Sequence, residues 1–342
     1  MHDHEAMLWD ALDDGRVRCQ VCQFRCVIPN GKRGVCKVRA NRQGTLYTLI
    51  YGLVSSAAAD PIEKKPLFHF FPGTEVFSLG TWGCNFHCRH CQNWEISHCE
   101  PEEGIFLRGQ RYLSAEDSIA LTRKYRCAGI AWTYNEPTIW FEYTYDGARL
   151  AKAQGLYTVY VTNGFITPEA LDTIGPYLDA FRVDIKGFTT EFHRKLMGLT
   201  KWQGVLESAV RAKKKWNMHV EAVTNVIPGL NDDEPQLTAL AKWILESLGP
   251  ETPWHVTRFY PHAQMSHLPP TPISTLERAY RIGKEVGLRF VYTGNVPGHA
   301  AENTVCYNCG NRVIERVGYR TQAPGLDAGR CRRCGADLNI RG

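Results

Sequence analysis

The 342-residue chain has few of the features that mark membrane, secreted or nucleic-acid-binding proteins. It has no run of about 18 apolar residues, which a membrane-spanning helix needs. Its first residues, MHDHEAMLWDALDDGRV, lack the basic and apolar segments of a secretion signal. Repeats and low-complexity tracts are absent. The formal net charge of +5 is modest and the basic residues are scattered, which argues against nucleic acid as a partner. We therefore expect a cytoplasmic protein that does not enter a membrane.

In such a reducing compartment, cysteines are expected to bind metals rather than to form disulfides. The sequence contains thirteen cysteines. Three groups are apparent: Cys19, Cys22, Cys26 and Cys36; Cys84, Cys88 and Cys91; and Cys306, Cys309, Cys331 and Cys334. Cys99 and Cys127 stand alone, and we interpret both as buried or unreactive thiols.

Short β-rich runs alternate with amphipathic helical segments between residues 74 and 298. The predicted strands are 75–81, 129–134, 156–163, 180–187, 218–227, 254–261 and 288–294. Their nearly continuous apolar character is typical of a parallel sheet covered on both faces. The repeated strand-then-helix order predicts an α/β fold, either a barrel-like or an open parallel sheet. Active groups should lie at the carboxyl ends of its strands.

Several predicted helices have recognisable ends. The start signals are Ser114 with Asp117, Ser274 with Glu277, and Thr167 followed by Pro168. Within 232–248, apolar residues recur at helical spacing, and Gly249 ends the run.

The two ends of the chain differ from this central region. Residues 1–73 carry the first cysteine group and end in a turn-rich connector, DPIEKKPLFHFFPG. Residues 299–342 carry the last group and are too few to build much core without a metal. The predicted organisation is a cysteine-rich segment (1–73), an α/β core (74–298) and a small metal-binding module (299–342).

The middle cysteine group, in GCNFHCRHCQN, follows the first strand of the predicted core. A [4Fe–4S] cluster normally takes four cysteines. Three cysteines leave one iron open for a substrate or cofactor, as an open position does in catalytic zinc sites. The alternative is a zinc site that is completed by His87, His90 or His98.

This pattern resembles the radical SAM superfamily, in which S-adenosylmethionine binds the open iron of a [4Fe–4S] cluster through its amino and carboxylate groups. The resemblance implies a partial (β/α) barrel and an external low-potential electron donor. It also implies reductive cleavage of S-adenosylmethionine to methionine and a 5′-deoxyadenosyl radical that abstracts hydrogen.

The same resemblance implies cofactor contacts at Glu136 and His90. Glu136, in TYNEPT, stands where family members have the acidic residue of a GGE-like motif that meets the cofactor's amino group. Tyr134 and Asn135 replace the two glycines, and Glu136 could instead be a surface carboxylate that caps a turn before Pro137. His90 stands where members mostly place a larger aromatic against the adenine.

The triplet Thr162, Asn163 and Gly164 resembles a motif of pyruvate formate-lyase activating enzymes. There, an acidic residue before the triplet helps to bind a monovalent cation. Val161 stands in its place, which puts that cation site in doubt. An ordinary turn is the alternative for Asn163 and Gly164.

Two further strand ends carry motifs of this kind. Asp184 and Lys186, in DIK, also resemble the activating enzymes, although alternation places both on one face and an ion pair is the alternative. Pro228 and Gly229, in VIPGLND, resemble the loop that touches the adenosine moiety, but such residues are common in turns.

The resemblance extends over essentially the whole chain to the radical SAM protein family of the AmmeMemoRadiSam system. It is carried by RCQVCQFRCVIPNGKRGVCKVR, DPIEKKPLFHFFPG, YNEPTIWFEY, PWHVTRFYP and GNVPGH. It implies Memo-like and AMMECR-like proteins as partners. Activation of a glycyl radical enzyme is a second hypothesis, and a non-catalytic zinc scaffold is a third.

The terminal cysteine groups fit structural metal sites. Cys306, Cys309, Cys331 and Cys334 form two CxxC pairs, each followed by glycine, for which we favour zinc over a rubredoxin-like iron. Arg330, Arg332 and Arg333 give only modest support to nucleic-acid binding by this module. For Cys19, Cys22, Cys26 and Cys36 we prefer zinc, and an auxiliary iron–sulfur cluster is the alternative, because spacing alone does not decide the metal.

Overall fold

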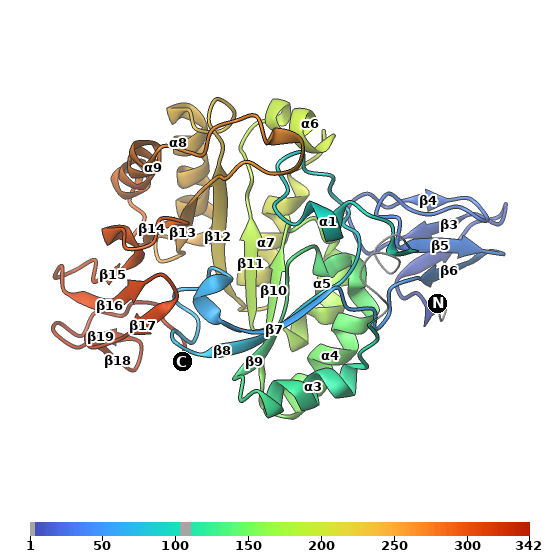
Figure 1. Ribbon diagram of the computed structural model, residues 1–342, viewed down its shortest axis with the longest axis horizontal. Coiled ribbons are helices and arrows are strands. Elements are labelled where there is room, and N and C mark those ends of the chain that lie inside the picture. The colour runs from blue at the N-terminus through green and yellow to red at the C-terminus, as the bar shows by residue number, and fades with distance from the viewer. Residues whose placement is uncertain (1–3, 103–110) are drawn as a thin grey trace. The chain divides into compact units, whose positions relative to one another are not determined.

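The computed structural model describes residues 4–102 and 111–342 (Figure 1). Residues 1–3 of the predicted N-terminal segment lie outside this part. By its internal contacts the chain divides into two compact units. Unit 1 comprises residues 1–60, 75–181 and 201–218, and unit 2 comprises 61–74, 182–200 and 219–342. No helix of the described residues has the length and apolar composition needed to cross a membrane.

Unit 1 begins with two small antiparallel sheets. One has the order β1-β6-β5 and the other β2-β3-β4. Their strands are β1 (His4–Glu5), β2 (Trp9–Ala11), β3 (Val17–Cys19), β4 (Val27–Ile28), β5 (Arg39–Arg42) and β6 (Thr45–Thr48). A backbone hydrogen bond from Cys19 to Cys26 (3.0 Å) closes the β3–β4 hairpin. This hairpin brings the first three cysteines of the N-terminal group to one place.

A parallel sheet forms the larger part of unit 1. β8 (Glu75–Gly80) and β10 (Tyr157–Thr162) both run parallel to β9 (Gly129–Trp132). β7 (Ser56–Pro61) lies beside β8, and the first residues of β11 (Ala180–Asp184) lie beside β10. Helices α3 (Ala115–Lys124) and α4 (Phe141–Ala153) pack on these strands (Figure 1). The other helices of unit 1 are α1 (Trp94–Ser97), η2 (Pro137–Trp140), α5 (Pro168–Ile174), η3 (Gly175–Tyr177) and α7 (Gly204–Lys214).

Unit 2 has its own run of parallel strands. The last residues of β11 lie beside β12 (His219–Val226), followed by β13 (Trp254–Arg258) and β14 (Val291–Gly294). Helices α8 (Glu234–Trp243) and α9 (Ile273–Val286) pack together, and α9 also packs on β13 and β14 (Figure 1). The remaining helices of this unit are η1 (Ile62–Lys64), α6 (Thr190–Met197), η4 (Ile244–Leu248), η5 (Ala263–Met265) and η6 (Ala300–Glu302).

The C-terminal part of unit 2 is built from short antiparallel strands. β15 (Thr304–Val305), β16 (Arg312–Val317) and β17 (Arg320–Gln322) form one sheet, and β18 (Leu326–Asp327) pairs with β19 (Arg330–Cys331). A cluster of buried side chains that includes Phe290, Tyr292, Val313, Ile314 and Leu338 supports both sheets.

All seven predicted strands of the core are confirmed, with shorter ends. The strand predicted at 180–187 stops at Asp184, and the one predicted at 288–294 starts only at Val291. Strand β7 was missed because its sequence, SAAADP, is rich in small residues with weak β-propensity. Pairing with β8, rather than local preference, makes this segment a strand.

Two of the three predicted helix starts are confirmed. Ser114 accepts a hydrogen bond from the Asp117 N–H (3.0 Å), and Thr167 accepts one from the Ala170 N–H (3.2 Å). The Ser274 cap is wrong, because α9 already begins at Ile273 after an extended Pro272 that has no capping side chain. The predicted helical run through 232–248 is confirmed as α8 and η4.

A buried carboxylate organises the middle of unit 2. Glu221, on β12, accepts hydrogen bonds from the backbone N–H groups of Phe68 (2.9 Å) and His69 (2.7 Å). It also contacts Nε2 of His219 (2.9 Å) and Nε2 of His255 (2.6 Å). Burial would raise the pKa of Glu221, but the hydrogen bonds from the two histidines outweigh burial and hold this pKa well below its usual range. Within unit 2, Glu221 therefore fixes the 61–74 connector to β12.

We expect Glu221→Ala to lower the free energy of unfolding by about 3–5 kcal/mol, because it leaves four buried donors without an acceptor. Urea denaturation of the metal-loaded chain measures the change. Glu285→Ala, an exposed substitution on α9, is the control and should stay within about 0.5 kcal/mol of the wild type. Equal stability of the two variants would contradict this role of Glu221.

Candidate iron–sulfur and cofactor site

The three central cysteines lie in the loop between β8 and α1. Cys84 and Cys88 are buried, and Cys91 is partly exposed. The Cys91 N–H donates to the Cys88 carbonyl (3.0 Å), and the Gly83 N–H donates to the Ile96 carbonyl (2.8 Å). Gly83 has a φ of +84°, a conformation that favours glycine. The chain therefore turns sharply at the end of β8, and the three thiols follow within one short loop.

Polar groups surround the first of these thiols. The Phe86 N–H donates to Cys84 Sγ (3.3 Å), and Asn163 Nδ2 lies 3.9 Å from the same sulfur. Asn163 Nδ2 also donates to Asn85 Oδ1 (2.7 Å). The other amide atom of Asn85, Nδ2, is buried and has no hydrogen-bond partner among the described residues. This donor is available to an acceptor bound at the loop.

The thiols of this loop fit an iron–sulfur cluster. Burial raises the pKa of the Cys84 thiol well above its usual value, and the neighbouring Glu136 carboxyl and Cys88 thiol raise it further. Such thiols become thiolates only when a metal cation replaces their protons. Hydrogen bonds of the kind that Phe86 and Asn163 direct at Cys84 are a means of tuning such clusters.

The alternative of a zinc site with a histidine finds no support in this part of the chain. The ring centroids of His87 and His98 lie 5.6 Å apart, so the two histidines contact each other. Burial lowers the pKa of both histidines. Within residues 4–102 and 111–342, no histidine joins the loop cysteines in a group of three ligand atoms close enough to share one ion.

Glu136 lies at the carboxyl end of β9 and is fully buried. Its Oε1 accepts hydrogen bonds from the Thr138 N–H (2.9 Å) and from Thr162 Oγ1 (2.7 Å), and its Oε2 accepts one from the Asn163 N–H (2.7 Å). Burial raises the pKa of Glu136, although the hydrogen bonds from Thr138 and Asn163 oppose the rise. Glu136 therefore caps η2, which starts at Pro137, and also ties the end of β9 to the end of β10; it is not the surface carboxylate of the alternative interpretation.

The Thr162–Gly164 triplet forms the turn that follows β10. Gly164 has a φ of +74°, and the Phe165 N–H donates to Asn163 Oδ1 (3.0 Å). The hydrogen bond within this segment fits the turn interpretation, and the same segment presents Asn163 to Cys84, so the cofactor contact stays a prediction. Sequence reasoning missed Asn85, the residue between these two side chains. Its only signal was a polar residue directly after the first cysteine of the loop.

The remaining predicted cofactor contacts include four residues of unit 2. Asp184 Oδ2 lies 3.0 Å from Lys186 Nζ, and Asp184 Oδ1 pairs with Arg182. Burial would raise the pKa of Asp184, but Arg182 and Lys186 lower it. The ion pair that was the alternative interpretation is present, and the cofactor contact stays a prediction. Arg182 was missed although alternation puts it on the same face.

The last two predicted contacts in unit 2 form a turn after β12. Gly229 has a φ of +72°, and its N–H donates to Asp232 Oδ1 (2.8 Å). Pro228 precedes it in this turn. In unit 1, His90 is buried in the cysteine loop.

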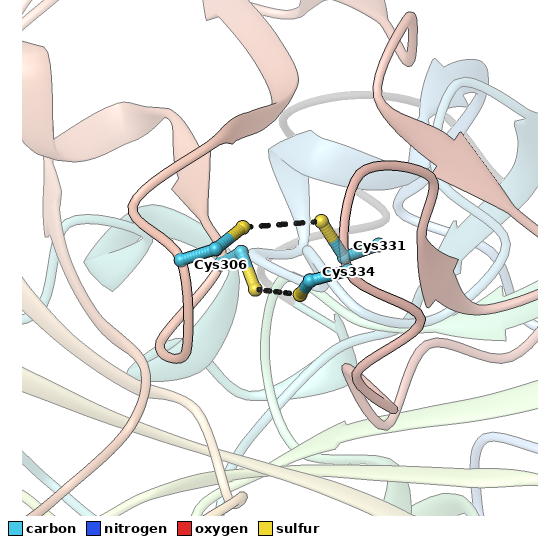
Figure 2. A group of neighbouring side chains, drawn as sticks. Cys306, Cys331 and Cys334 are labelled. Carbon is cyan, nitrogen blue, oxygen red and sulfur yellow. Dashed lines mark hydrogen bonds between the residues drawn. The ribbon is translucent and has the colours of Figure 1, made fainter.

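The four C-terminal cysteines converge on one point (Figure 2). Their sulfur atoms all lie within 4.8 Å of one another, with Cys306 and Cys334 3.6 Å apart and Cys309 and Cys331 3.7 Å apart. Zinc–sulfur bonds of about 2.3 Å in a tetrahedron give sulfur–sulfur distances of about 3.8 Å. The spacing therefore suits a single tetrahedral ion.

Two matching turns hold this site. The Gly310 N–H donates to the Cys306 carbonyl (3.0 Å), and the Gly335 N–H donates to the Cys331 carbonyl (2.8 Å). The nearby arginines contact the module itself, because Arg330 Nη1 donates to the Gly335 carbonyl (3.1 Å) and Arg332 Nη2 to the Leu326 carbonyl (3.2 Å).

The N-terminal cysteines are also brought together. Cys19, Cys22, Cys26 and Cys36 line one cavity of unit 1, together with Arg39. Unlike the C-terminal cysteines, they form no group of closely spaced ligand atoms among the described residues.

Comparisons with known proteins place this site in a family. The chain is 43% identical over 338 residues to an uncharacterized protein of Methanocaldococcus jannaschii, covering 98% of this chain and 99% of that one. The family model of the radical SAM superfamily matches residues 79–241, which include the three loop cysteines. The chain belongs to the radical SAM superfamily.

Other similar proteins of this superfamily are more distant. An isethionate sulfite-lyase activating enzyme of Desulfovibrio desulfuricans is 23% identical, covering 66% of this chain and 70% of its own. The pyruvate formate-lyase 1-activating enzyme of Escherichia coli is 23% identical, covering 47% of this chain and 65% of its own. In fold, the chain is similar to a radical SAM methyltransferase from Sphaerobacter thermophilus, with a TM-score of 0.50 at 15% identity over 69% of this chain and 70% of that one.

The radical SAM fold and the enzyme class predicted from the sequence are confirmed. The central domain has the partial α/β barrel-like fold of this superfamily. Membership implies an enzyme that uses a [4Fe–4S] cluster and S-adenosylmethionine. The Thr162–Gly164 and DIK motifs suggested a similarity to activating enzymes. The alignment with the isethionate sulfite-lyase activating enzyme shows that this similarity covers 66% of the chain.

We expect one C-terminal metal ion per chain, and we expect it to be zinc. The double substitution Cys306→Ser and Cys334→Ser should remove one zinc per chain and destabilise the module, because the metal replaces a core there. Elemental analysis and limited proteolysis measure the two effects. Cys127→Ser, which alters an isolated cysteine, should keep all of the zinc. A rubredoxin-type iron spectrum that disappears in the double variant would contradict zinc.

Proposed function

We propose that Cys84, Cys88 and Cys91 hold a [4Fe–4S] cluster with which the protein cleaves S-adenosylmethionine reductively, and that the product radical abstracts hydrogen from a protein or small-molecule substrate. The observation that carries the proposal is the geometry of the loop after β8. It gathers three thiols, two of them buried, and directs the Phe86 N–H at Cys84 Sγ (3.3 Å). Three cysteines leave one iron open for the cofactor.

When bound, the cluster and S-adenosylmethionine supply a single electron and a 5′-deoxyadenosyl radical. The chain's own residues bind and orient this cofactor. Glu136 Oε2 accepts one hydrogen bond, from the Asn163 N–H (2.7 Å), which leaves a lone pair for the cofactor's ammonium group. Because Thr162 and Thr138 also bind this carboxylate, its position is fixed before the cofactor arrives.

The other cofactor contacts are proposed from the sequence resemblance, residue by residue. Gly164 shapes the turn that holds Asn163, and its φ of +74° suits glycine. We assign His90 to stacking against the adenine, and Pro228 and Gly229 to contact with the adenosine moiety. Asp184 and Lys186, paired at 3.0 Å, provide one charge of each sign for the polar groups of the cofactor.

The substrate and partners follow from sequence resemblance. An external low-potential donor supplies the electron, and the AmmeMemoRadiSam resemblance assigns Memo-like and AMMECR-like proteins as partners. Activation of a glycyl radical enzyme is the second candidate, favoured by the similarity to activating enzymes. The cytoplasmic location expected from the sequence remains a proposal.

Anaerobic incubation with S-adenosylmethionine and dithionite, with and without the Memo-like and AMMECR-like proteins, separates these candidates. All of the proteins are then analysed by mass spectrometry. A modified Memo-like or AMMECR-like protein supports the first. A glycyl radical on an enzyme encoded nearby supports the second.

The combined substitution of Cys84, Cys88 and Cys91 by alanine should abolish formation of 5′-deoxyadenosine, because no thiolate remains to hold the iron. The C-terminal zinc should stay at one per chain. The measurements are chromatography of the anaerobic reaction and elemental analysis. Continued 5′-deoxyadenosine formation by this variant would refute the assignment of the cluster to the loop.

Glu136→Gln tests the ammonium contact. A charge-assisted hydrogen bond is worth about 1.5–3 kcal/mol, so affinity for S-adenosylmethionine should fall by roughly 10- to 100-fold with unchanged iron content. Thr162→Val is the matched control, because it removes one donor to the carboxylate and keeps the charge; we expect less than about a threefold loss. Unchanged affinity in Glu136→Gln would assign this residue to the turn alone. Lost iron would mean that Glu136 supports the cysteine loop.

A further inference from the structure

The N-terminal cysteines form a buried site that the proposed chemistry does not use. Cys19, Cys22 and Cys36 are buried, and Cys26 is partly exposed. All four line the same cavity. They come from two places in unit 1, the β3–β4 hairpin and the turn before β5, where the Lys37 N–H donates to the Gly34 carbonyl (2.8 Å). A cavity lined by four converging thiols is a metal site by its composition.

The spacing of the sulfur atoms indicates what kind of metal group this cavity takes. The C-terminal cysteines of the same chain form sulfur–sulfur contacts of 3.6 and 3.7 Å, as a single tetrahedral ion requires. In the part of the chain that the structure describes, the N-terminal thiols form no comparably tight group. The three cysteines of the loop after β8 share this open spacing. Four thiols that line one cavity, with no three of the described sulfur atoms all within 4.8 Å of one another, suit a cluster of several irons and sulfides better than a single tetrahedral ion.

A buried cation completes the site. The guanidinium of Arg39 is 2% exposed and lines the cavity, with Nη1 3.8 Å from Cys19 Sγ. Its Nη2 pairs with the buried Glu142, which also accepts the Met7 N–H (2.7 Å). Arg39 Nε is buried and has no hydrogen-bond partner among the described residues. This N–H is therefore free to donate to the sulfur of a bound cluster, which acts as an acceptor.

The cavity lies directly against the loop of the radical SAM cluster. A Cβ atom built at Gly83, the residue before Cys84, would lie 3.1 Å from the Cys36 carbonyl oxygen and 2.7 Å from Val38. Cys22 forms a β-bridge with Ile166, just after Asn163. Phe165 connects the two loops, because its ring contacts those of Phe24 (5.1 Å) and Phe86 (5.2 Å).

We infer that Cys19, Cys22, Cys26 and Cys36 hold a second [4Fe–4S] cluster, and that this cluster passes electrons to the one held by Cys84, Cys88 and Cys91. The inference rests on the proposed function for its second half. A protein donor of the flavodoxin or ferredoxin class gives one electron to the N-terminal cluster, which is reduced by one unit. That electron would then pass to the cluster held by Cys84, Cys88 and Cys91. The loop cluster would gain one electron, and the N-terminal cluster would lose it and return to its oxidised state. The site preferred as zinc from its sequence is thereby assigned to iron.

Metal content tests, without any activity measurement, whether the four N-terminal cysteines hold a [4Fe–4S] cluster. The wild type and the variant with alanine at 84, 88 and 91 are reconstituted anaerobically with ferrous iron and sulfide. We expect about eight irons per wild-type chain and about four per variant chain, with one zinc in each. About four irons in the wild type and none in the variant, with a second zinc, would overturn the inference. About four irons in both would instead support the N-terminal cluster and overturn the loop assignment.

A comparison of two electron donors tests whether the N-terminal cluster passes electrons to the loop cluster. The double variant Cys22→Ala and Cys36→Ala should keep about four irons and one zinc. With dithionite, a small reductant, its 5′-deoxyadenosine formation should match that of the wild type. With reduced flavodoxin the rate should fall at least tenfold. Equal rates with flavodoxin in both proteins would overturn the relay.

A spectroscopic measurement decides the matter if the double variant does not fold. The reduced N-terminal cluster is observed by electron paramagnetic resonance in the alanine triple variant and in the wild type. A second reduced cluster close by speeds spin relaxation, so the wild-type signal should saturate at higher microwave power. Identical saturation in the two proteins would overturn the relay.

Discussion

The structure depends on the need to match its buried carboxyl groups with hydrogen-bond donors or a cation. An isolated carboxylate or thiolate in an apolar interior is too costly to persist. Glu136 meets this need with two backbone N–H groups and the hydroxyl of Thr162. Because those donors come from the ends of two strands, satisfying one carboxylate also fixes the two loops that follow β9 and β10. The geometry of the proposed cofactor site is a consequence of this requirement.

Glu221 shows the same constraint in unit 2, with a different result. Its partners are two histidine rings and two backbone N–H groups of the connector, so its role is to hold a segment in place. Glu142 shows it a third time, with Arg39 as the partner. The chain uses buried carboxylates both where chemistry is proposed and where only structure is at stake. Burial alone therefore does not identify a functional acid, and the strand end at which it lies must be considered as well.

The sequence predicted the parts of this arrangement that depend on local patterns. Alternating strands and helices, the caps at Ser114 and Thr167, and the three cysteine groups all follow from spacing within short segments. Strand β7 escaped prediction because its small residues become a strand only by pairing with β8. Asn85, Arg182 and the Arg39–Glu142 pair escaped for a similar reason. Their roles arise from contacts such as Asn163 with Asn85, which are distant in the sequence and exist only after packing.

Metal identity shows how three-dimensional geometry adds to a motif. CxxC spacing is compatible with zinc or iron. The separation of the sulfur atoms distinguishes the two better, because a single ion needs closely spaced sulfurs and an iron–sulfur cluster needs more widely spaced ones. Gly83 lies where the loop of Cys84, Cys88 and Cys91 meets the N-terminal cysteine site. Its φ of +84° starts the loop of the radical SAM cluster, and its missing side chain leaves room for the Cys36 carbonyl. A residue with a Cβ would strain the loop and push away the N-terminal site at the same time. One glycine thus couples two cysteine sites into a single packed unit, as the inferred transfer of electrons between them would require.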